Sequence, residues 1–153
     1  MTAKNWLKGL VAGFIATIVL SALMLIKARM GLMPGLNPIK MMTDTLNAST
    51  PAVGWVMHFL IGTVLWGTLF AWLDPSLPGT SHWQKGILFS VGAWLLMMIF
   101  MMPMAGVGLF AASLGVMAAV MTLVLHVIYG IVLGGVYGLE RPEPAHAFHW
   151  LHR

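Results

Sequence analysis

Two histidines set deep in long uncharged stretches are the residues whose chemistry stands out in this sequence. His58 lies 16 residues before Asp74 and His126 lies 14 residues before Glu140, so helices ending at these acids would hold both imidazoles at nearly equal depth. Imidazole is a common metal ligand and an axial ligand of haem iron. The pair therefore predicts a bound metal ion or b-type haem. The alternative is that each ring hydrogen-bonds to a neighbouring helix and only fixes packing.

A glycine follows each histidine one helical turn later, Gly62 after His58 and Gly130 after His126. Residues four apart share one face of a helix. A missing side chain on that face would leave room for a flat cofactor, or would let another backbone approach closely. We include both glycines among the predicted cofactor-binding residues.

Methionine is abundant, with fourteen in the chain. Met97, Met98, Met101, Met102 and Met104 cluster at the end of the predicted third helix, and Met41 and Met42 lie in the first connection on the same side. Thioethers suit Cu(I). Methionine is also a flexible filler of apolar packing, and packing is the role we expect here.

The last fourteen residues, 140–153, form a polar tail with three histidines. His146, His149 and His152 are spaced by three, which would keep them near one helical face for a metal. Pro142 and Pro144 argue against a rigid site. We expect a tail that lies at the membrane interface.

The distribution of charge predicts the elements that position the histidines. Apolar residues make up 59% of the 153 residues and charged residues 8%, and the mean hydropathy is +0.90. A soluble domain carries about 25% charged residues. No Asp, Glu, Lys or Arg occurs in residues 9–26, 45–73 or 86–139. Since one span needs about 20 apolar residues, the third stretch must cross twice.

An all-α fold of four transmembrane helices follows, with helices near 6–26, 52–73 and 83–102 and a fourth that begins between 110 and 115 and ends near 139. Residues 1–139 form a single transmembrane domain. The first connection contains Asn37-Pro38, a helix-starting pair. Ile39, Met42 and Leu46 recur at helical spacing after it, which predicts a short amphipathic helix at the membrane interface.

Two segments of the chain match each other in order. Trp6-x-Lys8-Gly9 returns as Trp83-x-Lys85-Gly86, and the pattern around His58 and Gly62 returns around His126 and Gly130. This predicts two parallel helix–loop–helix repeats, residues 6–73 and 83–139. The second and fourth helices would then be diagonal in the bundle, with both histidines turned inward.

Several functions are excluded or disfavoured. The absence of cysteine excludes disulfides, iron–sulfur clusters and c-type haem. The uncharged stretches hold no acidic relay, and the sequence shows no nucleophile–base pair, so we expect no catalytic activity. The net charge of +4 comes from residues beside the span ends, which favours lipid contact over nucleic-acid binding.

Charge also predicts the orientation of the chain. Four spans place both termini on one side, together with five basic residues: Lys4, Lys8, Lys85, Arg141 and Arg153. The other side holds three: Lys27, Arg29 and Lys40. The positive-inside rule then puts the termini in the cytoplasm.

Runs of residues in all four predicted helices resemble an uncharacterised family of small four-helix membrane proteins of bacteria. The resemblance rests on residues 8–17, on Gly54-Trp55 with His58-Phe59 and Gly62-Thr63-Val64, on residues 92–98, and on residues 121–126 with Gly130. It covers most of residues 6–139. It implies a protein of the bacterial inner membrane and supplies no activity.

Three functional hypotheses follow. The first is a small non-catalytic subunit of a larger respiratory or electron-transfer complex in the bacterial inner membrane. Its contacts with other subunits or with itself would use small-residue faces: Gly9, Gly13, Gly130, Gly134 and Gly138. The second is a redox or sensor protein that binds b-type haem or a metal through His58 and His126. The third is a small transporter, which the lack of charged residues in the spans disfavours.

Overall fold

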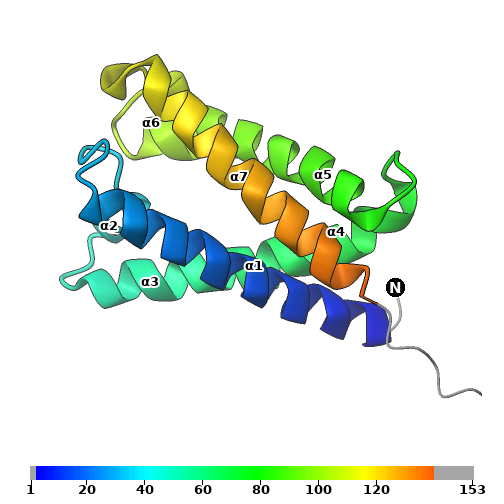
Figure 1. The fold of residues 1–153 in the computed structure, drawn as a ribbon. Helices are drawn as coiled ribbons and strands as arrows, with labels where there is room; N and C mark the ends of the chain where they lie inside the picture. Colours follow the sequence, from blue (N-terminus) through cyan, green and yellow to red (C-terminus); the bar gives the residue numbers. More distant parts are fainter. Residues whose placement is uncertain (1–2, 140–153) are drawn as a thin grey trace, which may run out of the picture.

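A computed structural model describes residues 3–139 and places them in an all-helical bundle (Figure 1). Four helical segments are long and apolar enough to cross a membrane, at Asn5–Arg29, Pro51–Ser76, His82–Met104 and Val116–Tyr137. Large apolar side chains cover the outer faces, for example Phe14, Ile18 and Leu25 on the first segment. The protein is therefore a multi-pass membrane protein with a four-helix bundle, as predicted.

The crossings differ in regularity. The first and fourth are continuous helices, α1 (Ala3–Arg29) and α7 (Val116–Tyr137). The second consists of α3 (Pro51–Phe59), the π-helical segment η1 (Leu60–Trp66) and α4 (Gly67–Leu73). The third consists of α5 (His82–Leu96), the π-helical segment η3 (Met97–Met101) and α6 (Met102–Met104). The short 3₁₀ turn η2 (Asp74–Ser76) follows α4.

A short capped helix forms in the first connection, as predicted. Helix α2 spans Pro38–Thr45, and the Asn37 side chain accepts a hydrogen bond from the Lys40 amide at 3.0 Å. Ile39 and Thr43 are buried, with their atoms close to Gly54 of α3. The helix is confirmed, and its placement at the membrane interface stays a prediction.

The fourth helix begins slightly later than predicted. A 3₁₀ segment, η4 (Leu109–Leu114), occupies the region where we placed its start, and α7 begins at Val116. Gly115 has a φ of 85°, a left-handed conformation that interrupts a right-handed helix. The break therefore lies at this glycine.

The bundle is built from two hairpins. Helix α1 packs against η1 and α4, α5 packs against α7, and α1 also contacts α7. Figure 1 shows the N-terminus and the end of α7 at one end of the bundle, and it shows the hairpins diverging toward the opposite end, where the loops after α1 and α6 lie. We call these the terminal end and the loop end. That the two hairpins are sequence repeats stays a prediction.

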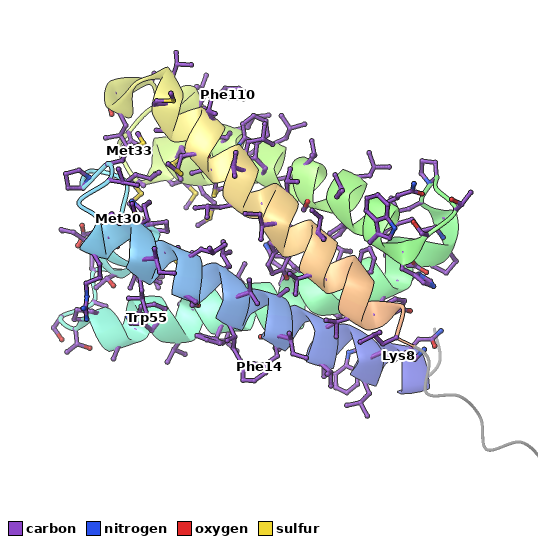
Figure 2. The ribbon with its side chains drawn as sticks, viewed as in Figure 1. Lys8, Phe14, Met30, Met33, Trp55 and Phe110 are labelled. Atoms are coloured by element: carbon purple, nitrogen blue, oxygen red, sulfur yellow. The ribbon has the colours of Figure 1, made fainter. Side chains whose placement is uncertain are left out.

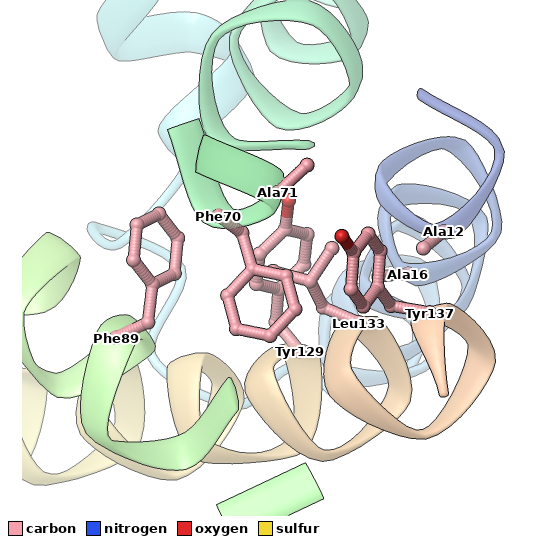
Figure 3. Close-up of a cluster of buried hydrophobic side chains, with 8 residues drawn as sticks. All are labelled: Ala12, Ala16, Phe70, Ala71, Phe89, Tyr129, Leu133 and Tyr137. Atoms are coloured by element: carbon pink, nitrogen blue, oxygen red, sulfur yellow. The ribbon is translucent and has the colours of Figure 1, made fainter. Parts of the chain in front are cut away.

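Two clusters of buried apolar side chains fill the bundle. The terminal-end cluster, drawn in Figure 3, comprises Ala12, Ala16, Phe70, Ala71, Phe89, Tyr129, Leu133 and Tyr137. The loop-end cluster comprises Leu36, Met98, Met102, Ala111 and Ala118. Met98 is 0% exposed, so packing is the role of at least part of the methionine group.

The small-residue faces, predicted to meet other subunits or a second copy of the chain, make close contacts inside the chain. Gly9 and Gly13 contact the backbone of Gly67, and Gly130 contacts the backbone of Gly86. Gly134 and Gly138 lie against His82. Close helix contact needs backbones without Cβ atoms, and within each hairpin these glycines supply it. Contacts of these glycines with other subunits or with a second copy of the chain stay a prediction.

Candidate cofactor cavity between the hairpins

Both predicted histidines line one cavity between the diverging hairpins, with a volume of about 350 Å³. The lining is mostly apolar. It comprises Thr17, Leu20, Met24, Pro38, Met42, His58, Ile61, Gly62, Leu65, Trp66, Ala93, Leu96, Met97, Phe100, Met101, Thr122, Leu125, His126 and Tyr129. Its size and its few polar groups are typical of a binding site for a small ligand or cofactor.

His58 reaches the cavity from α3 and is held by α1. Its Nε2 lies 3.1 Å from the Ser21 hydroxyl oxygen, and that hydroxyl donates to the Thr17 carbonyl at 2.7 Å. A hydroxyl has one proton to give, so Ser21 must accept from the imidazole. The neutral ring therefore carries its proton on Nε2 and its lone pair on Nδ1. Trp55 and Phe59 pack edgewise on the ring.

His126 reaches the cavity from α7. Its Nδ1 lies 2.8 Å from the carbonyl oxygen of Thr122, one turn earlier in the same helix. A carbonyl only accepts, so Nδ1 carries the proton and Nε2 carries the lone pair. Nε2 has no hydrogen-bond partner among residues 3–139, and the same holds for Nδ1 of His58.

Each imidazole is thus fixed by a hydrogen bond from one nitrogen and keeps a basic nitrogen free. Metal-ligating histidines characteristically donate their second N–H to a carbonyl, carboxylate or water, which sets the tautomer and the orientation of the ring. His126 has this arrangement with a carbonyl, and His58 has it with a hydroxyl. The arrangement can supply two neutral nitrogen ligands to one space.

Both π-helical segments of the described chain border this cavity. Segment η1 contributes Gly62 and Trp66, and η3 contributes Met97 and Met101. π-Helical turns are rare and occur frequently at functional sites. The Tyr129 hydroxyl donates to the Gly62 carbonyl at 2.6 Å, which ties α7 to η1 across the bundle beside the cavity.

The two predicted glycines have different surroundings. Gly62 lines the cavity, although Thr17 occupies the space that a Cβ there would need. Gly130 is outside the lining and lies against Gly86 and Ser90 of α5. Of the two roles predicted for Gly130, close backbone approach is the one these contacts show, and a role in binding a cofactor stays a prediction. The tail histidines His146, His149 and His152 lie outside the described residues.

Sequence reasoning missed the hydroxyl that orients His58 and the hydrogen bond that ties α7 to η1. Ser21 is 37 positions from His58, and Tyr129 is 67 positions from Gly62. No local pattern signals such long-range contacts. Hydroxyl groups inside predicted spans were the one available signal.

A second polar cluster lies at the terminal end, away from the cavity. Asp74 is buried, its carboxylate is 2.7 Å from Nδ1 of His82, and its backbone carbonyl accepts from Lys85 Nζ at 2.8 Å. The ring of Tyr137 packs edgewise on His82. The cluster joins the α4–α5 connection to the end of α7.

Comparison with known proteins places the chain in a family without adding an activity. No curated protein and no solved structure matched it. One family model covers residues 3–148, nearly the whole length of the chain. On that match, the chain belongs to the family of unknown function DUF6789.

Proposed function

We propose that this membrane protein binds a transition-metal centre between His58 and His126, either a single ion or the iron of b-type haem, and works as a redox component. The observation that carries the proposal is the pair of oriented imidazoles, each with a free lone pair, lining one cavity. Free lone pairs suit a Lewis-acidic metal. A quinone carbonyl would require donors instead.

Purely structural histidines are the competing interpretation. A histidine that only fixes packing is expected to use its hydrogen-bonding capacity within the bundle, because unpaired polar atoms in an apolar interior cost free energy. Among residues 3–139, one nitrogen of each ring has no hydrogen-bond partner, and both rings line the same space. This supports ligation over packing.

Membership of a larger respiratory or electron-transfer complex stays a prediction. The small size of the chain and a single buried redox centre would suit an electron-carrying subunit. Extraction in mild detergent should then yield the chain within a larger particle, and a monodisperse particle of this chain alone would contradict it. Transport gains no support, since the cavity lining contains no Asp, Glu, Lys or Arg.

The test is the metal and haem content of the purified full-length chain. The protein is extracted in mild detergent through a tag other than polyhistidine, with the three tail histidines changed to Gln so that they cannot bind metal. We expect about one metal centre per chain in this background. Either His58→Gln or His126→Gln should abolish it. His82→Gln, which removes an imidazole at the terminal end, serves as the matched control and should keep it.

Two results would overturn the proposal. One is a preparation without metal or haem that also fails to take up Cu(I), Fe(II) or haem when these are supplied. The other is metal binding that persists in the His58→Gln/His126→Gln double variant while the fold is retained.

A further inference from the structure

Four thioethers face the same cavity as the two imidazoles. Met24 comes from α1, Met42 from α2, and Met97 and Met101 from η3. Figure 2 shows sulfur atoms gathered between the diverging ends of the two hairpins. The cavity is therefore bordered by soft sulfur donors from three separate segments as well as by nitrogen donors.

The methionines of the third crossing divide into two groups. Met98 and Met102 belong to the loop-end cluster and are 0% and 3% exposed. Met97 and Met101 are only partly buried and line the cavity. Packing accounts for the first group, and Met97 of the second group also packs against the loop-end cluster. The second group, four residues apart in a π-helical segment, presents both side chains to the same space as the histidines.

The side chains that line the cavity limit which metal ions it can bind. Residues 3–139 contain no group of three or more His, Asp or Glu that could hold an ion, and the chain has no cysteine. Zinc sites use three or four such ligands, and hard ions require oxygen donors. Neutral imidazole together with thioether is a set that suits Cu(I).

Charge favours a bare monovalent ion over haem. Haem b carries two carboxylates, and carboxylates buried in an apolar site need cationic partners. The cavity lining has no Lys or Arg. A monovalent ion bound by neutral ligands adds a net charge of only +1 to the apolar bundle. The free-energy cost of burying an ion rises with its net charge.

A second cavity lies next to this one at the loop end. It has a volume of about 670 Å³ and lies beside α2, lined among others by Lys40, Asp44 and Trp55. Met24 and Pro38 line both cavities, so the two adjoin. The Met24 side chain therefore lies between the outer cavity, which has Lys40 and Asp44 in its lining, and the inner one.

We propose that the metal centre is a single Cu(I) ion, bound by His58 and His126 together with the thioethers of Met97 and Met101. This inference rests on the proposed function, since it names the metal of the same site. Its distinctive claim is sulfur ligation by two particular methionines.

The experiment uses Cu(I) itself, added without oxygen to the full-length chain with its tail histidines changed to Gln. A coloured Cu(I) chelator competes for the ion and reports the affinity. We expect one Cu(I) per chain, and sulfur in its coordination shell by X-ray absorption. Met97→Leu and Met101→Leu should each weaken binding roughly tenfold or more. Met98→Leu is the matched control, a neighbouring methionine outside the cavity, and should leave the affinity unchanged.

The outcomes separate this inference from the proposed function. A histidine-dependent haem, or a Cu(I) ion with only nitrogen ligands, would overturn the copper–thioether inference and leave the proposed function standing. Equal affinity in Met97→Leu, Met101→Leu and Met98→Leu would also overturn it. Failure to bind any metal or haem would overturn both.

Discussion

Lys27 shows how a single charged side chain is accommodated at the end of a membrane helix. It is buried, and its ammonium donates to the backbone carbonyls of Leu32, Met33 and Leu36 at 3.1, 3.1 and 2.6 Å. An ammonium has three protons, so its donors are fully used. Lys27 therefore closes the turn after α1 and offers no free charge to a ligand.

We predict that Lys27→Met destabilises the protein by about 2–3 kcal/mol, because it leaves the buried carbonyl of Leu36 and the partly buried carbonyls of Leu32 and Met33 without their donor. Thermal unfolding in detergent measures the change. Lys40→Met is the control: Lys40 is exposed and pairs only with Asp44, a contact worth about 0.5 kcal/mol or less. Equal losses of stability in the two variants would show that Lys27 does not form these hydrogen bonds to the turn after α1.

The Ser21 hydroxyl holds the His58 ring, so a Ser21 variant tests whether the orientation of that ring matters for metal binding. Removing its hydroxyl in Ser21→Ala frees Nε2 and lets the ring change tautomer. We predict that metal affinity falls roughly 10- to 100-fold while the helical content is retained, as for other residues that orient ligands. Ser113→Ala, at an exposed position of η4, is the control. Unchanged affinity in Ser21→Ala would mean that Ser21 does not position the ligand.

Glycines, which lack a side chain, let the helices of each hairpin pack with their backbones in direct contact. A Cβ on Gly130 would overlap the Gly86 carbonyl and the Ser90 side chain, whereas a Cβ on Gly135 meets nothing within 4 Å. Both residues lie in α7. The interface between α5 and α7 is thus specified by one face of the helix.

Gly130→Ala should therefore cost about 1–3 kcal/mol through overpacking. Gly135→Ala should be neutral or stabilise the helix by up to about 1 kcal/mol, since alanine is the better helix former. Thermal unfolding of the two variants under identical conditions compares them. A Gly130→Ala variant as stable as Gly135→Ala would contradict the described α5–α7 contact.

The elements also show what the sequence can and cannot predict. Uncharged length predicts the four crossings, and Asn37-Pro38 predicts α2, because both signals are local. The equal depth of His58 and His126 also follows from counting residues along helices. The π-helical segments, the Ser21 contact and the carbonyls around Lys27 depend on which faces meet, and spacing alone does not determine that. For the same reason the sequence does not show that the glycine faces join helices of this chain.

At the scale of the whole molecule, four crossings place the connections on opposite sides of the membrane. The loop containing Ser49 and the segment containing Ala112 belong to the loop end, and Ser76 lies in the connection at the terminal end. All three residues are exposed. The positive-inside rule predicts that the terminal end, with Lys8 and Lys85, faces the cytoplasm.

Because the chain has no cysteine, single-cysteine variants test this orientation without background. In intact cells a membrane-impermeant maleimide should label Ser49→Cys and Ala112→Cys. It should label Ser76→Cys only after permeabilisation. The reverse pattern would invert the orientation, and labelling of all three in intact cells would contradict the four-span topology.

The claim that His58 and His126 serve one metal centre is tested most directly by nuclear magnetic resonance of the full-length chain, with its three tail histidines changed to Gln and its remaining histidines labelled with ¹⁵N. The chain is titrated with Ag(I), a diamagnetic substitute for Cu(I). Before addition, Nδ1 of His58 and Nε2 of His126 should appear unprotonated. One equivalent of Ag(I) should shift both of these nitrogens together and then saturate, with His82 unaffected. Opposite tautomers, or a shift in only one of the two rings, would contradict the claim that both imidazoles serve one metal centre.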